Sequence, residues 1–141
     1  MATTITANGI NFPDGSAGSP SIGGSDTNTG LFTGSDIVGF ATGGSERLRI
    51  DASGNVNIAN DSGKLQLGTS ADLQIYHDGT HSRIKNDTGT LFTLADEVRF
   101  KNNANNETLL VATANGAVEL YHDNSKKFET YANGCTVTGN L

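Results

Sequence analysis

Apolar and polar residues alternate along most of this chain, in short runs that end at Gly, Asn or Asp. In the run LQIYHDGTHSRIK, residues 73–85, Leu73 and Ile75 alternate with polar neighbours, and the alternation resumes near the end. A period of two places successive side chains on opposite faces of a strand. Asp78-Gly79 lies between the two halves, and Asp-Gly is a strong hairpin signal because both central residues of a type I′ turn need positive φ. The run therefore predicts two strands joined by a tight turn.

The same hairpin pattern occurs twice more. Residues 118–131, VELYHDNSKKFETY, repeat the Tyr-His-Asp and carry Asn124 where the first run has Gly. Asn is the next best residue at positive φ. Residues 38–51, VGFATGGSERLRID, have Gly-Gly at the turn and lack the Tyr-His-Asp. The returning strand of the first run is one residue out of phase with the other two, which a bulge or a shorter turn would absorb. The copies are irregularly spaced, so they predict related hairpins and not a solenoid of fixed period.

Short strands are predicted through the rest of the chain, and no window has the period of an amphipathic helix. The further strands that we expect are residues 31–32, 56–58, 64–67, 90–94, 97–101, 108–113 and 135–138. Residues 14–29 are rich in Gly, Ser, Thr and Asn, a composition typical of an extended linker. We expect residues 1–29 to form an N-terminal attachment arm and residues 30–141 to form a body of β-hairpin repeats.

The composition indicates that a single chain buries little. Hydrophobic residues make up 35% of the 141 residues, Trp is absent, and 18 residues are Gly. Oligomerisation is the usual remedy for a thin core, and pairing between chains also covers exposed edge strands. We therefore expect an all-β homotrimer, an intertwined and elongated β-prism or fibre in which each chain supplies one wall. The residues expected to point inward are Val38, Phe40, Leu48, Ile50, Leu73, Ile75, Ile84, Val98, Phe100, Val118, Leu120 and Phe128.

Charge and segment lengths argue against two classes of partner. The formal net charge of −6 disfavours nucleic acid, because phosphate binding needs a basic surface. The longest apolar run, residues 109–112, is far too short to insert into a membrane. The opening residues lack the basic and apolar regions of a signal peptide, so we expect synthesis in a cytoplasm. Cys135 is the only cysteine, and no disulfide within one chain is expected.

The candidate site residues are Tyr76, His77, Asp78, Tyr121, His122 and Asp123. Three interpretations are open: a turn in which Asp caps the backbone, a surface contact with a glycan or protein partner, and a set of metal ligands. Adjacent residues of a strand point to opposite faces, which favours the turn. No nucleophile motif is present, so we expect neither an enzyme nor a cofactor. The carboxylates of Glu119, Asp123 and Glu129 keep glycan cleavage open, because that reaction needs two of them across a substrate.

Several runs of the chain resemble a known class of proteins. They are ITANGINFPDG (5–15), DTNTGLFTGSDIVGFATGGSERLRIDASGNVNI (26–58), DLQIYHDGTHSRIKNDTGTLF (72–92), VRFKNNANNETLLVATANGAVELYHDNSKKFET (98–130) and TVTGNL (136–141). These are similar to repeats in tail-fibre and other virion structural proteins of marine tailed bacteriophages, cyanophages especially. The resemblance implies an elongated, β-rich homotrimer attached to other tail or baseplate proteins. It implies no catalytic motif.

The function expected from these observations is that of a virion structural protein on the phage tail or particle surface. Ile5, Ile10 and Phe12 would anchor the arm to the particle, and the body would act as a rigid spacer and as an adhesin for a host-envelope glycan or protein. Two other functions are open. One is a monomeric β-sandwich that binds carbohydrate, and the other is a fragment of a tailspike that degrades polysaccharide.

Overall fold

The structure is a computed structural model that describes residues 4–6, 9–58 and 60–139. Within these residues every regular element is a β-strand, which confirms the all-β prediction. The strands are β1 (Thr4–Thr6), β2 (Gly9–Asn11), β3 (Ile22–Gly23), β4 (Gly30–Gly34), β5 (Ile37–Thr42), β6 (Ser45–Ile50), β7 (Val56–Asn57), β8 (Lys64–Leu67), β9 (Leu73–His77), β10 (Ser82–Asn86), β11 (Glu97–Lys101), β12 (Thr108–Thr113), β13 (Val118–His122), β14 (Ser125–Tyr131) and β15 (Gly134–Val137).

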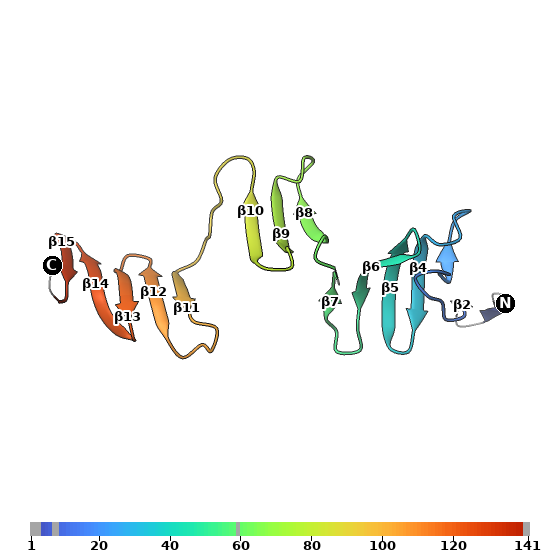
Figure 1. Ribbon diagram of the computed structural model, residues 1–141, viewed down its shortest axis with the longest axis horizontal. Helices are drawn as coiled ribbons and strands as arrows, with labels where there is room; N and C mark the ends of the chain where they lie inside the picture. Colours follow the sequence, from blue (N-terminus) through green and yellow to red (C-terminus); the bar gives the residue numbers. More distant parts are fainter. Residues whose placement is uncertain (1–3, 7–8, 59, 140–141) are drawn as a thin grey trace. The chain divides into compact units, whose positions relative to one another are not determined.

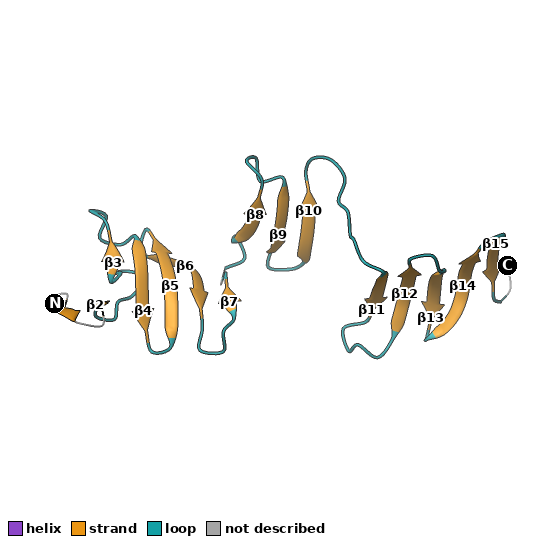
Figure 2. Ribbon diagram, turned by 180° about the vertical axis from the view of Figure 1, so that it is seen from behind, coloured by secondary structure: helices purple, strands orange, loops and turns teal. Residues whose placement is uncertain are grey.

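The described strands form antiparallel sheets in which neighbours in sequence are neighbours in space (Figures 1 and 2). We name the sheets by their strands: β1–β2, β3–β7, β8–β10 and β11–β15. Short connections between antiparallel strands make this order the expected one for a chain of hairpins. The chain divides into two compact units, Met1–Thr90 and Leu91–Leu141, and we describe each by itself.

The expected border between arm and body, at residues 29 and 30, is spanned by a strand pair. β3 lies antiparallel to β4, with Ile22 opposite Leu31. The amide of Gly15 also donates a hydrogen bond to the carbonyl of Thr33, at 3.0 Å. Part of residues 14–29, which the composition predicted to be extended, therefore adds an edge strand to the β3–β7 sheet.

The repeated hairpin of β5 and β6 has a two-residue turn followed by a bulge. Gly43 and Gly44 lie at φ of 57° and 74°, as a type I′ turn requires. The register then shifts by one residue, so that Phe40 lies opposite Leu48. The hairpin of β13 and β14 has both turn residues at positive φ and a shift at the equivalent place. In both hairpins the bulge returns the apolar residues of the second strand to the face of the first.

The hairpin of β9 and β10 accommodates its different length in the loop. Its register has no bulge, and Ile75 lies opposite Ile84. The connection is the four-residue loop 78–81, in which Gly79 is at φ 87° while Asp78 is not at positive φ. The expected type I′ turn at Asp78-Gly79 was therefore wrong. The longer loop keeps Ile75 and Ile84 on the same face of the sheet. The bulge has this effect in the other two hairpins.

The strand expected at residues 90–94 is also not formed: this segment has no regular structure. The residues before it are held by their own contacts. The amide of Asp87 donates to the carbonyl of Asp72 at 2.7 Å, and the hydroxyl of Thr88 donates to the Asp72 carboxylate at 3.0 Å. Residues needed for a turn back along β10 are therefore engaged beside the start of β9.

The core of the described residues is small, as the composition indicated. The buried apolar side chains are Phe32, Ala41 and Val111, and the one buried polar side chain is Gln74. Phe32 packs across the strand pair onto Gly39, where a β-carbon would lie 2.2 Å from the ring. Glycine is needed at this position because the aromatic ring occupies the space of a side chain. Phe32 thus lies on the face of the sheet opposite to that of Phe40, the residue after Gly39 on β5.

Replacing Gly39 with Ala should destabilise the β3–β7 sheet, because the added methyl group displaces the Phe32 ring. We expect a loss of about 1–3 kcal/mol in the free energy of unfolding, as for other overpacked sites, measured by urea denaturation. Gly24→Ala is the matched control, since nothing lies within 4 Å of an added β-carbon there. Its effect should stay within about 0.5 kcal/mol. Equal losses in the two variants would contradict the packing of Phe32 on Gly39.

Candidate functional site

One face of each larger sheet is apolar and uncovered in the single chain. We define the apolar faces by the following residues: Leu31, Val38, Phe40, Leu48, Ile50 and Val56 in the β3–β7 sheet; Leu65, Leu67, Leu73, Ile75 and Ile84 in the β8–β10 sheet; and Val98, Phe100, Leu110, Val118, Leu120, Phe128 and Val137 in the β11–β15 sheet. All of the residues expected to point inward lie on these faces. None of them is buried in the single chain, and Ile84 is 65% exposed.

In the β11–β15 sheet the apolar side chains form a continuous row across all five strands. Phe100 lies opposite Leu110, which lies opposite Leu120, and Phe128 and Val137 continue the row. Cross-strand neighbours on one face have β-carbons about 5 Å apart, so such a row is a contiguous apolar surface. Phe100, the first member, is 59% exposed. Contiguous apolar surface of this kind is typical of sites that bind another protein.

The opposite face of the β8–β10 sheet is polar and closed by its own contacts. Gln74, at its centre, accepts from Lys64 Nζ at 2.9 Å and donates to the Asp87 carboxylate at 3.0 Å. Asp87 also accepts from Lys85 Nζ at 2.7 Å. Lys64 Nζ lies 4.3 Å from the ring centre of Tyr76, a cation–π arrangement. The network satisfies Gln74, which explains how this polar side chain is buried in the middle of an open sheet.

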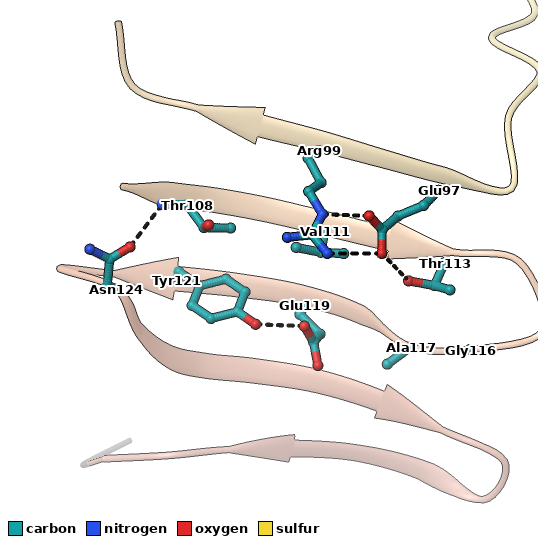
Figure 3. A pocket seen from close by; sticks show the side chains of 10 residues that line it. All are labelled: Glu97, Arg99, Thr108, Val111, Thr113, Gly116, Ala117, Glu119, Tyr121 and Asn124. Carbon is teal, nitrogen blue, oxygen red and sulfur yellow. Dashed lines mark hydrogen bonds and ion pairs between the residues drawn. The ribbon is translucent and has the colours of Figure 1, made fainter. Parts of the chain in front are cut away.

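The polar face of the β11–β15 sheet carries a shallow depression, whose lining residues Figure 3 shows. Arg99 makes two hydrogen bonds to the carboxylate of Glu97. The hydroxyl of Tyr121 donates to Glu119 at 2.6 Å, and this bond is the main reason that the pKa of Glu119 is lowered and that of Tyr121 raised. Val111 lies beneath these side chains and is buried. Each charged group that lines the depression thus has a hydrogen-bond partner within the depression.

Lys126 links two of the carboxylates that kept glycan cleavage open. Its Nζ lies 2.7 Å from Glu129 and 3.0 Å from Glu119. Hydrogen bonds to Glu129 and Glu119 raise the pKa of Lys126, so this lysine stays protonated between them. Asp123, the third carboxylate, is at the turn and its side chain is 85% exposed. A general acid in glycan cleavage needs a raised carboxyl pKa, whereas Lys126 favours the ionised form of Glu119.

Tyr76, His77 and Asp78 do not act together on one face. Tyr76 lies on the polar face with Lys64, and His77 is the next residue of the same strand. Asp78 caps the loop: its carboxylate accepts the amide of His81 at 2.8 Å and that of Thr80 at 3.1 Å. The Asp78 carboxylate also accepts a hydrogen bond from the guanidinium of Arg83 on β10. This bond is the main reason that the pKa of Asp78 is lowered to about 2. This copy supports the turn interpretation.

Tyr121, His122 and Asp123 are arranged differently. Tyr121 bonds to a carboxylate on the polar face, as described above. Asp123 lies at φ 49°, inside the two-residue turn, and is not a cap like its counterpart in the β9–β10 loop. The Asp123 carboxylate lies 3.7 Å from the ring of His122, and the side chains of His122 and Asp123 are 77% and 85% exposed. Within the described residues, no three His, Cys, Asp or Glu side chains come together as metal ligands would.

The residues expected to anchor the arm fall in and after the β1–β2 hairpin. Ile5 lies directly opposite Ile10 in the strand register. Phe12 follows β2 and is half-buried. These placements are those of a small hairpin, and the anchoring role stays a prediction.

Asp51 is a structurally important residue that the sequence interpretation did not single out. Its carboxylate accepts the amides of Ser53 and Asn55, both at 3.0 Å, and the side-chain amides of Asn55 and Asn57 at 3.1 and 2.9 Å. These bonds, led by those from Asn55, lower the pKa of Asp51 to about 2. The sequence does contain a signal for this arrangement, because Asp51, Ser53, Asn55 and Asn57 occupy every second position. Asp, Asn and Ser side chains at this spacing favour turns that are closed by side-chain hydrogen bonds to the backbone.

Comparison with known proteins gave no relative: no protein family, no curated protein and no solved structure matches this chain. Among the described residues there is no helix that is both long and apolar enough to cross a membrane.

The carboxylates of Asp51 and Asp78 should make stability depend on acid pH. Each folded-state pKa is about 2, below the ordinary value of 3.8, so the stabilisation is complete above about pH 4 and is lost as the pH falls toward 2. We expect the midpoint of thermal unfolding, followed by circular dichroism, to drop across this interval. Asp51→Asn and Asp78→Asn should lower the midpoint at pH 6 and flatten its dependence on pH.

Asp123→Asn is the matched control, because the Asp123 carboxylate is 85% exposed and Asn is well tolerated at positive φ. This variant should follow the pH profile of the unchanged protein. If all three variants gave the same profile, the two capped turns would not be the source of the acid sensitivity.

Proposed function

We propose that this chain is a segment of a homotrimeric phage fibre, a virion structural protein whose apolar faces meet around a common axis. The N-terminal segment with Ile5, Ile10 and Phe12 would attach to other tail or baseplate proteins. The remaining sheets would form a rigid spacer that presents its polar faces and turns to the host envelope. The resemblance of the repeats to cyanophage tail-fibre sequences supports this proposal, and so does the uncovered apolar face of each larger sheet.

The exposed apolar faces are the observation that carries the proposal. In the β11–β15 sheet, Phe100, Leu120 and Val137 are 59%, 42% and 47% exposed, although they belong to one continuous row. Burial of apolar surface contributes about 25 cal/mol per Å², so covering a Phe or Leu side chain contributes roughly 1.5–3 kcal/mol. A face with many such residues favours association, and three identical faces around an axis would cover one another.

Packing within the chain gives less support to a monomeric carbohydrate-binding sandwich. A sandwich needs two sheets stacked face to face. Within residues 4–90, and again within residues 91–139, the apolar faces of the described larger sheets stay exposed, as Ile84 and Phe100 show, where a sandwich would bury them under a second sheet. The apolar faces are therefore left for a partner. A polysaccharide-degrading function gains no support from Glu119 and Glu129, which both bind Lys126.

Solution mass is the first test of the trimer. Residues 1–141, purified and analysed by light scattering coupled to size exclusion, should give the mass of three chains, about 44 kDa from the 14.6 kDa of one chain. Elution should be early for that mass, because a fibre segment is elongated. A species with the mass of one chain would exclude the proposed trimer.

A substitution on the apolar face should weaken the trimer selectively. Phe100→Ser removes a side chain that is largely exposed in the single chain, so the cost to an isolated chain is small while the cost to a covered face is roughly 2–3 kcal/mol per copy. Arg99→Ser, on the neighbouring polar position, is the control. On dilution, Phe100→Ser should dissociate at a higher concentration than Arg99→Ser. Equal dissociation of both would show that this face is not the trimer contact.

A further inference from the structure

The most exposed large apolar side chains of the described residues lie outside every strand. Phe92 and Leu94 are 75% and 88% exposed, and Leu91 is 49% exposed. All three belong to the segment Leu-Phe-Thr-Leu, within residues 90–94, whose alternation predicted a strand. The segment contains no charged residue and no Pro, so its composition is compatible with a covered strand.

A vacant edge suits this segment in length and in the pattern of its faces. β10 is an edge strand of the β8–β10 sheet, so one side of its backbone has no strand partner in the described residues. β10 is five residues long, as is the segment. Its central residue, Ile84, is 65% exposed and ends the apolar row that runs through Ile75. An antiparallel strand with Phe92 opposite Ile84 would extend that row and place Leu94 on the same face.

The turn that would bring the segment back onto its own β10 is engaged elsewhere. A direct hairpin requires Asp87, Thr88 and Gly89 to turn toward the free edge. Instead, Asp87 and Thr88 bind Asp72, at the start of β9 and thus on the opposite side of β10. The carbonyls of Thr88 and Gly89 accept the side-chain amide of Asn86, at 2.7 and 3.0 Å.

We propose that residues 90–94 of one chain pair, in antiparallel orientation, with the free edge of β10 of a second copy. The inference rests on the proposed trimer, in which each chain would donate its segment to the next and the exchange would close after three chains. Every copy would carry both parts of this interaction, the free edge of β10 and the unpaired segment of residues 90–94. Exchange of an identical element between chains is a common route to a stable oligomer. It would cover both an exposed edge and the most exposed apolar side chains.

A disulfide placed across the proposed pair tests the exchange. In a background with Cys135→Ser, we would combine Ile84→Cys with Phe92→Cys, since opposing residues of paired strands are close enough for a disulfide. Oxidation should convert the chains into covalent dimers and trimers on a non-reducing gel. Lys85→Cys with Phe92→Cys is the matched control, because Lys85 and Ile84 point to opposite faces, and its cross-linking should be at least tenfold weaker.

Two further samples separate the exchange from the trimer itself. Under reducing conditions, light scattering of the same variant gives the oligomeric state without the cross-link. When a chain carrying only Ile84→Cys is refolded together with one carrying only Phe92→Cys, exchange should yield a mixed disulfide.

A trimer by light scattering with only intrachain disulfides, or with none, would overturn the exchange and leave the trimer standing. A monomer by light scattering of the unsubstituted chain would overturn the proposed trimer and the exchange together.

Discussion

Each of the three larger sheets has apolar side chains that the single chain leaves uncovered. An antiparallel sheet with one apolar face is stable only when another layer covers that face. In the β8–β10 sheet Leu65, Ile75 and Ile84 form a row across three strands, and each of them is at least 44% exposed. On the other face, the long polar side chains form ion pairs and amide hydrogen bonds with one another. The contacts among these residues therefore leave the apolar faces as the part of the structure that the proposed trimer would cover.

Strand register is what keeps those faces continuous, and the three repeated hairpins preserve it by different means. In β6 and β14 an extra residue is placed in a bulge after a two-residue turn. In the central copy the loop is longer and the ladder is regular. A slip of one residue would move Ile84 to the face of Tyr76, so the pairing of apolar residues outweighs the preference of Asp-Gly for a type I′ turn. The same change of loop makes Asp78 a cap, whereas Asp123 stays exposed.

The sequence predicted strands where alternation was strong and turns were short. The bounds of β8, β11 and β12 agree with the expected ranges. β8 and β11 have apolar residues at every second position between Gly, Asn or Asp, whereas β12 contains the continuous apolar run of residues 109–112. The sequence could not reveal that residues 90–94 are not paired with another strand. Alternation shows which side chains share a face of a strand, but it does not show which neighbouring strand the backbone pairs with. Phe32 was predicted to lie in a strand. Its packing on Gly39 could not be predicted from the local sequence, because it depends on the register of the opposing strand.

In the proposed fibre, the polar faces and the turns differ in how readily they would contact a host surface. A partner that bound the polar face of the β8–β10 sheet would have to compete with the Gln74, Lys64 and Asp87 contacts, and displacing such bonds offsets much of what new ones contribute. At the turn of His122 and Asp123 the side chains are largely exposed, and the described residues form no comparable network there. In a trimer this turn would occur three times, so weak contacts at each copy would add through avidity. The repeated Tyr-His-Asp therefore has a structural role in one copy and an accessible surface in the other.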